Sequence, residues 1–336
     1  MIREYLKLVR SFNAVLTGIS PVMGAIAMKQ YDLPFLFLLF LIGFLGHAYG
    51  FILNDILDYK IDKSSREISI RPLVSGTISI KKAWILAFTS LIAAFILSLY
   101  LAYVTQSYTP LIILAISAFF VTLYDVTSKK FSFADFIIAL GIFFIILYGA
   151  ISVVNTIDKI TPIAWLVCIL GTIQVLYMQI VAGGIKDVEN DFNIGAKTFA
   201  IKLGVRVING NLKTSLAFKI LTYTIQITNT VLIFIPLFII KDFNDSSTLR
   251  YFQLIILSII AVSMFIPTYK ILSMKHFKRS RAIQFIGIYY IFNFTLVPIM
   301  LMSLNPWTGL LIFLPPLGFV LSNVVLHGTI LQPKTM

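Results

Sequence analysis

Long apolar runs separated by short polar segments dominate the sequence. Ten of them have roughly the 17–25 residues that an α-helix needs to cross the hydrocarbon core of a bilayer. They cover about residues 13–29, 34–53, 83–104, 110–127, 134–156, 162–184, 215–240, 249–272, 283–303 and 306–328. The first run is short and contains Gly18, Pro21 and Gly24, and only Asn305-Pro306 divides the last two. The pattern predicts a multi-span bundle of nine to ten transmembrane helices.

The composition supports this fold class. Hydrophobic residues make up 59% of the chain and charged residues 12%, with a mean hydropathy of +0.94. Soluble domains carry about 25% charged residues, so we predict an all-α integral membrane protein that forms a single domain over residues 1–336. Cys168 lies inside an apolar run, which excludes a disulfide framework. Residues 1–10 lack the small-residue cleavage site of a secretory signal.

The net charge of +13 follows the expected membrane topology. Of the 27 Lys and Arg residues, only Lys29, Lys159, Lys241 and Arg250 follow odd-numbered runs. Short loops rich in Lys and Arg stay in the cytoplasm. We therefore predict a multi-pass protein of the cell membrane with both termini in the cytoplasm. Anionic lipid headgroups are sufficient partners for this basicity, and no nucleic acid partner is expected.

Two short stretches concentrate carboxylates in a chain that has only 14 acidic residues. The first contains Asn54, Asp55, Asp58 and Asp62, and the second contains Lys186, Asp187, Glu189 and Asp191. Each stretch directly follows an apolar run, at a membrane boundary where a charge is costly and usually functional. Four predicted crossings separate the two stretches, so both are expected on the cytoplasmic side.

The spacing of these carboxylates indicates metal and phosphate chemistry. On a helix, Asp55, Asp58 and Asp62 share one face, and so do Asp187 and Asp191. Carboxylates without His or Cys favour Mg²⁺ or Ca²⁺, and Mg²⁺ often completes its coordination with substrate phosphates. Cations that could hold a diphosphate lie in the same loops and in the loop after Tyr124: Arg66, Arg71, Lys129, Lys130, Lys186 and Lys197.

These stretches resemble the ordered signatures of the UbiA superfamily of intramembrane prenyltransferases. The first signature is similar to Asn54-Asp55-x-x-Asp58-x-x-x-Asp62 followed by Arg71-Pro72-x-x-Ser75-Gly76. The second is similar to Asp187-x-x-x-Asp191-x-x-x-Gly195-x-Lys197-Thr198, and Tyr124 with Lys129 resembles the family's Tyr-and-Lys loop. The resemblance extends from the N-terminus to about residue 275 and leaves the C-terminal spans at about 283–328 beyond it.

The resemblance implies Mg²⁺-dependent transfer of a prenyl group from a polyprenyl diphosphate to a lipophilic acceptor. The reaction would pass through an allylic carbocation, in a bundle whose active-site cavity is open to the bilayer. By position, one Mg²⁺ would be bound by Asn54, Asp55, Asp58 and Asp62, and a second by Asp187 and Asp191. Asp55, Asp58, Asp187 and Asp191 would be the catalytic residues. Diphosphate contacts are implied for Arg71, Tyr124, Lys129 and Lys186.

Some positions differ from the family pattern. Members usually have nine spans, and Asp125 stands where many of them have Ser. Ile180 occupies a region where members that act on aromatic quinone precursors often carry a further Asp. The short Lys186-Asp187-x-Glu189-x-Asp191 form resembles archaeal members that prenylate a glycerol phosphate ether lipid. We favour that acceptor, and an aromatic quinone precursor is the alternative.

Two other classes of membrane protein also use carboxylates. A cation-coupled transporter would place ionisable groups near the midplane of broken helices, whereas these clusters follow the spans. A lipid phosphoalcohol transferase would need an Asp-Gly followed by Ala-Arg, which the sequence lacks. Charges outside one span often only mark the interface, but two matching clusters on one side favour an enzyme.

Overall fold

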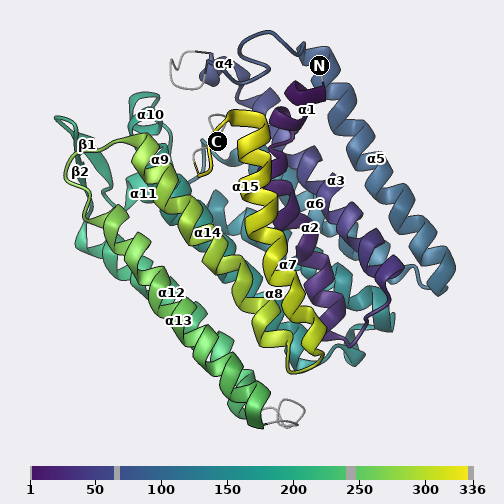
Figure 1. The fold of residues 1–336 in the computed structure, drawn as a ribbon. Coiled ribbons are helices and arrows are strands. Elements are labelled where there is room, and N and C mark those ends of the chain that lie inside the picture. Colours follow the sequence, from purple (N-terminus) through teal and green to yellow (C-terminus); the bar gives the residue numbers. More distant parts are fainter. Residues whose placement is uncertain (1, 64–68, 240–246, 332–336) are drawn as a thin grey trace. The chain divides into compact units, whose positions relative to one another are not determined.

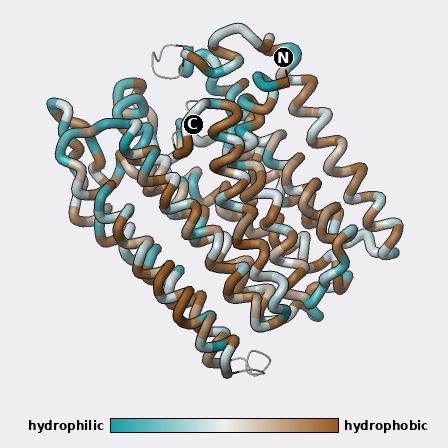
Figure 2. Tube along the Cα trace, viewed as in Figure 1, coloured by the Kyte–Doolittle hydropathy of each residue, from teal (hydrophilic) through white to brown (hydrophobic). Residues whose placement is uncertain are grey.

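Helices make up most of the protein in the computed structural model (Figure 1). The structure describes residues 2–63, 69–239 and 247–331, so Arg66 and Lys241 lie outside the described residues. Within these ranges, nine helices are long and apolar enough to cross a membrane, and they match nine of the ten predicted runs. Helix α2 (Ser11–Ala27) matches the first run but has only 17 residues. Figure 2 shows hydrophobic residues along the long helices and hydrophilic residues near helix ends.

The chain forms two compact units, and each is described separately. Unit 1 contains residues 1–127, 140–168 and 316–336. Its elements are α1 (Ile2–Leu8), α2, α3 (Leu33–Leu57), α4 (Tyr59–Asp62), α5 (Ile80–Thr105), α6 (Thr109–Thr127), most of α7 (Ala134–Val154), the 3-10 helix η1 (Ile157–Lys159), the start of α8 (Pro162–Leu176) and most of α15 (Leu314–His327).

Unit 2 contains residues 128–139 and 169–315. It holds the rest of α8, the π-helix η2 (Tyr177–Gly183), α9 (Gly184–Lys186), α10 (Val188–Asn193), α11 (Phe199–Lys202), β1 (Arg206–Ile208), β2 (Asn211–Lys213), α12 (Leu216–Ile239), α13 (Ser247–Leu272), α14 (Arg279–Leu301) and the 3-10 helix η4 (Pro306–Phe313). The two strands pair antiparallel around Asn209 and Gly210. Both of these residues have positive φ, as a type I′ hairpin turn requires.

Small residues let α2 pack directly against the backbone of α7 in unit 1. A Cβ atom on Gly149 would lie 1.8 Å from the carbonyl oxygen of Pro21, and one on Gly24 would lie 2.2 Å from that of Ile146. Close backbone approach through glycine is a common way for membrane helices to associate. The glycines that make the first run look like a weak span are therefore packing residues, and nearly all of α2 is buried.

Aromatic and hydroxyl groups fill part of the interior of unit 2. The ring of Tyr177, at the start of the π-helix, stacks on Tyr289 of α14 with centroids 3.8 Å apart. The Tyr177 hydroxyl lies 2.6 Å from the hydroxyl of Thr268 on α13. These contacts fix the π-helix against its neighbours just before the chain reaches Lys186 and Asp187.

We expect Gly149→Ala to destabilise the protein, because the new methyl group would press on backbone that cannot move aside. Overpacking of this kind costs about 1–3 kcal/mol. Gly46→Ala is the matched control, because its Cβ would meet nothing within 4 Å and alanine favours a helix by about 0.5–1 kcal/mol. Thermal unfolding in detergent measures both variants. An unchanged melting temperature for Gly149→Ala would contradict the close α2–α7 contact.

Candidate active site

The first acidic cluster, Asn54, Asp55, Asp58 and Asp62, lies where α3 runs into α4 in unit 1. The amide of Asp58 donates to the carbonyl of Asn54 at 2.9 Å, and the amide of Asp62 donates to that of Asp58 at 2.8 Å. Helical turns therefore continue through the cluster, as the spacing predicts. Asp55, Asp58 and Asp62 are only 3%, 8% and 5% exposed, so these carboxylates need neutralising partners.

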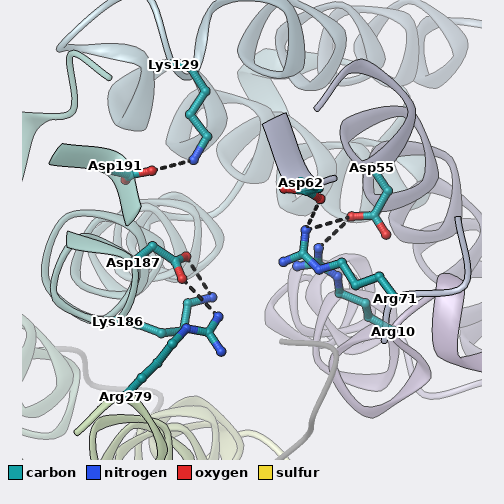
Figure 3. A network of polar contacts seen from close by, with 9 residues as sticks. All are labelled: Arg10, Asp55, Asp62, Arg71, Lys129, Lys186, Asp187, Asp191 and Arg279. Atoms are coloured by element: carbon teal, nitrogen blue, oxygen red, sulfur yellow. Dashed lines mark hydrogen bonds and ion pairs between the residues drawn. The ribbon is translucent and has the colours of Figure 1, made fainter. Parts of the chain in front are cut away.

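Two arginines partner the first acidic cluster (Figure 3). Arg10 Nη2 lies 2.7 Å from Asp55 Oδ1, and Arg71 Nη1 lies 3.5 Å from the same oxygen. Arg71 also donates to Asp62. Burial raises the pKa of Asp62, and the charge of Arg71 offsets only part of that effect. A further cation near this end of unit 1 would therefore stabilise the ionised form of Asp62.

The Arg-Pro-Leu-Val-Ser stretch forms a turn that holds Arg71 in place. The amide of Ser75 donates to the carbonyl of Arg71 at 2.9 Å, and the amide of Ile78 donates to that of Pro72 at 3.1 Å. Gly76 adopts a φ of 77°, which glycine tolerates without strain. Leu73 is buried and anchors the turn.

Sequence reasoning missed Arg10, which it counted only as a topology signal. Arg10 has a left-handed backbone, with φ 50° and ψ 52°, in the break between α1 and α2. Its guanidinium group lies 4.8 Å from the centre of the Phe51 ring, one helical turn before Asp55. Left-handed backbone is uncommon for a residue other than glycine. An arginine directly before an apolar run was the available signal.

Asp125 is a further carboxylate at this end of unit 1. It lies in the last turn of α6, is 6% exposed and accepts a hydrogen bond from the side chain of Asn54. Tyr124, the preceding residue, is half-buried. Unit 1 thus brings together five predicted site residues, Asn54, Asp55, Asp58, Asp62 and Arg71, and adds Arg10 and Asp125.

The second acidic cluster, Asp187 and Asp191, follows the π-helix in unit 2. The amide of Asp191 donates to the carbonyl of Asp187 at 2.9 Å, so the two residues are one helical turn apart, as predicted. Lys129 Nζ lies 2.8 Å from Asp191 Oδ1. The amide of Lys197 donates to the carbonyl of Lys129 at 3.0 Å and holds the basic loop beside this cluster.

Asp187 is bound by two cations (Figure 3). Lys186 Nζ lies 3.1 Å from one of its oxygens, and Arg279 Nη2 of α14 lies 3.0 Å from the other. Sequence reasoning did not select Arg279, because nothing along the chain connects the start of α14 with Asp187. Burial alone would raise the pKa of Asp187, but Lys186, Arg279 and Lys129 together hold it well below its usual range.

The two carboxylates of this cluster differ electrostatically. Burial raises the pKa of Asp191, and the charge of Lys129 does not fully offset it. Asp187 therefore remains ionised, whereas a further cation would stabilise the ionised form of Asp191. The predicted cations Lys130 and Lys197 have exposed side chains, and so does Glu189.

The donor groups fit a divalent cation that arrives with a phosphate ligand. Among the described residues, no group of three or more His, Cys, Asp or Glu side chains converges as a metal cage. The carboxylates instead form ion pairs with Arg and Lys. Mg²⁺ commonly takes one or two carboxylates and fills its shell with water and substrate phosphates, which matches an oxygen-only set of this kind.

Fold and site together define a helical membrane protein with buried carboxylates and cations at its helix ends. The sequence profile of the UbiA prenyltransferase family matches residues 14–243, and the chain belongs to this family. The protein is therefore a prenyltransferase. The predicted resemblance is confirmed, although the matched segment ends earlier than about residue 275.

The chain is also similar to individual proteins, at modest sequence identity. The chain is 28% identical over 211 residues to digeranylgeranylglyceryl phosphate synthase of Saccharolobus solfataricus, which covers 61% of this chain and 70% of that protein. It is 29% identical over 190 residues to 4-hydroxybenzoate octaprenyltransferase of Francisella tularensis subsp. novicida, covering 56% and 64%. A UbiA homologue from Archaeoglobus fulgidus, solved with GPP and Mg²⁺, has the same fold, with a TM-score of 0.62, 14% identity and coverage of 90% and 99%.

We expect Arg10→Met to lower stability strongly, because it would leave Asp55 buried with only the more distant Arg71. Removing one partner of a buried ion pair costs roughly 3–5 kcal/mol, and Arg71 should keep the loss near the lower end. Lys7→Met is the control, because the Lys7–Glu4 pair is partly exposed and such pairs contribute about 0–1 kcal/mol. Chemical unfolding in detergent compares the two variants. Equal losses of unfolding free energy in the two variants would contradict a stabilising role of the buried Arg10–Asp55 ion pair.

Proposed function

We propose that this protein transfers a prenyl group from a polyprenyl diphosphate to a glycerol phosphate ether lipid, with Mg²⁺ as cofactor. The family assignment supports the reaction class. The observation that carries the proposal is the burial of ion-paired carboxylates in both acidic clusters, which matches the binding of a metal-complexed diphosphate. The whole chain acts as one prenyltransferase domain in this proposal.

The residue roles follow from the two clusters. Asn54, Asp55, Asp58 and Asp62 would hold one Mg²⁺, and Asp187 and Asp191 a second. Arg71, Tyr124, Lys129 and Lys186 would contact the diphosphate. The metal would neutralise the charge that develops on the departing diphosphate. The solved UbiA homologue with bound GPP and Mg²⁺ supports a prenyl diphosphate and a divalent metal as ligands of this fold.

In the proposed reaction, the bond between the allylic carbon and the diphosphate oxygen breaks first. The electron pair leaves with the diphosphate, and the cationic side chains stabilise the growing negative charge. A lone pair of the acceptor hydroxyl then forms a new C–O bond with the allylic carbon, and the hydroxyl proton is released. Burial of the clusters keeps bulk water from competing with the acceptor.

Two observations support an ether lipid as the acceptor. Digeranylgeranylglyceryl phosphate synthases match over 211 residues in Saccharolobus solfataricus and over 245 residues in Sulfurisphaera tokodaii. Ile180 is buried in the π-helix, where members that act on aromatic acceptors often carry a further Asp. An aromatic quinone precursor is the second candidate, because 4-hydroxybenzoate octaprenyltransferases also match.

The proposed location is the cell membrane, with both termini and both clusters on the cytoplasmic side. The distribution of Lys and Arg among the loops supports this orientation. The transporter alternative is disfavoured, because the acidic clusters lie at the ends of α3 and α9 and not near the middle of a span.

We expect Asp58→Ala and Asp191→Ala each to abolish prenyl transfer, because each removes a carboxylate proposed to bind metal. Glu189→Ala is the matched control, since Glu189 lies in the same stretch but is exposed. Turnover is measured on purified protein with Mg²⁺ and labelled geranylgeranyl diphosphate, and membrane insertion is checked by fractionation. Normal turnover of either aspartate variant would refute the assignment.

The acceptor is tested with labelled geranylgeranyl diphosphate and a panel of lipophilic acceptors. We expect label to appear in an ether lipid when geranylgeranylglyceryl phosphate is supplied, and removal of Mg²⁺ by EDTA to stop the reaction. Transfer to 4-hydroxybenzoate alone would replace the ether lipid by the aromatic acceptor. Cation uptake into proteoliposomes without transfer to any acceptor would favour the transporter reading.

A further inference from the structure

Asp125 is held against the first acidic cluster by packing between α6 and α3. One turn before it, Thr122 Oγ1 lies 2.7 Å from the hydroxyl of Tyr49 on α3. A Cβ on Gly50 would lie only 2.8 Å from the side chain of Val121, so glycine lets the two helices approach closely. The last turn of α6 therefore has a fixed position beside the end of α3, where the side chain of Asn54 donates a hydrogen bond to Asp125.

The polar contacts of Asp125 are incomplete in a way that points to a ligand. One carboxylate oxygen accepts a hydrogen bond from the Asn54 side chain. The other, Oδ2, is buried and has no hydrogen-bond partner in the part of the chain that the structure describes. Asp55 and Asp58 are near enough for their charges to act on it, and so is Arg10. A bare carboxylate oxygen beside two like charges is costly unless something else binds there.

The hydrogen bond also fixes the direction of the Asn54 amide. An Asn side chain has one NH₂ group and one carbonyl oxygen. The hydrogen bond to Asn54 favours the carboxylate form of Asp125, so the NH₂ group of Asn54 is the donor. The carbonyl oxygen of Asn54 is thereby left for another partner, and carbonyl oxygens are ligands that Mg²⁺ accepts.

We propose that Asp125 is a positioning residue for a divalent cation at the first acidic cluster: it orients the carbonyl oxygen of Asn54 toward the cation, and its Oδ2 accepts a hydrogen bond from water that the cation retains. This inference rests on the proposed function. It assigns a role to a residue that departs from the family pattern, where many members have Ser.

A purely structural role makes a different prediction. Serine or asparagine could also accept a hydrogen bond from Asn54, so helix packing alone does not need a buried charge here. Partners that orient a metal ligand typically contribute 10- to 100-fold to metal affinity. The two roles can therefore be separated by measuring cation affinity and stability in the same variants.

The experiment uses purified full-length protein with Mn²⁺ and inorganic diphosphate as probes. Electron paramagnetic resonance counts bound Mn²⁺, and the Mg²⁺ dependence of prenyl transfer is measured in parallel. We expect Asp125→Asn and Asp125→Ser to weaken Mn²⁺ binding about 10-fold, and Asp125→Leu up to about 100-fold. Excess Mg²⁺ should restore most of the turnover of Asp125→Asn, because the carboxylates of the first acidic cluster remain.

Two controls report on structure and on charge. Thr122→Val removes the hydrogen bond to Tyr49 between the same two helices without touching a carboxylate, so Mn²⁺ affinity should not change. Asp158→Asn removes an exposed carboxylate from η1, outside the site, and should also leave affinity unchanged. If Asp125→Leu does not fold, the Asp125→Asn and Asp125→Ser variants decide the question.

The possible outcomes are distinct. Wild-type Mn²⁺ affinity and an unchanged Mg²⁺ dependence in Asp125→Asn and Asp125→Ser overturn this inference, as does an equal loss of affinity in Thr122→Val. Wild-type turnover of Asp58→Ala instead overturns the proposed function itself. Weakened cation binding by the Asp125 variants, with the controls unchanged, supports the inference.

Discussion

The neutralisation of buried carboxylates is the constraint on which the rest of the site depends. Transfer of an isolated carboxylate into an apolar interior costs far more than a folded protein can offset. In unit 1, Arg10 and Arg71 meet this requirement for Asp55 and Asp62. In unit 2, Lys129 meets it for Asp191. Helix ends, turns and even an unusual backbone conformation are arranged to bring these cations into place.

Turns and helix breaks in the backbone place these cations beside the carboxylates. The turn from Arg71 to Ile78 uses a left-handed Gly76 to fold back on itself. The π-helix Tyr177–Gly183 lies just before α9, which ends at Lys186, and π-helical segments are frequent at functional sites. At Arg10, by contrast, a residue other than glycine adopts the left-handed conformation. The ion pair with Asp55 and the contact with Phe51 compensate for that strain.

Hydrophobic periodicity predicted the helices well, because spans are defined by length and apolarity alone. Spacing also predicted the helical alignment within each acidic cluster. The sequence could not reveal Arg10 or Arg279 as partners, since Arg10 and Asp55 are 45 residues apart and Arg279 and Asp187 are 92 apart. Such pairs depend on tertiary packing. The sequence also could not reveal why the first apolar run contains glycines. They pack against neighbouring helices, and Gly149 of α7 lies far along the chain from the α2 residues that it contacts.

The two acidic clusters differ in the charged groups around them, and this difference affects which ligand charge each cluster attracts. At the first acidic cluster, the ion pairs among the described residues join Asp55 and Asp62 to Arg10 and Arg71, and Asp58 and Asp125 add further carboxyl groups. At the second, Asp187 and Asp191 form ion pairs with three cations, Lys129, Lys186 and Arg279. Excess negative charge attracts a cation, and excess positive charge attracts an anion. In the proposed site, the second acidic cluster thus combines two metal-binding carboxylates with several cations that suit phosphate oxygens, whereas the first offers mainly oxygen ligands for a cation. Asp125 adds to the first acidic cluster a carboxyl group that a serine at that position would not supply.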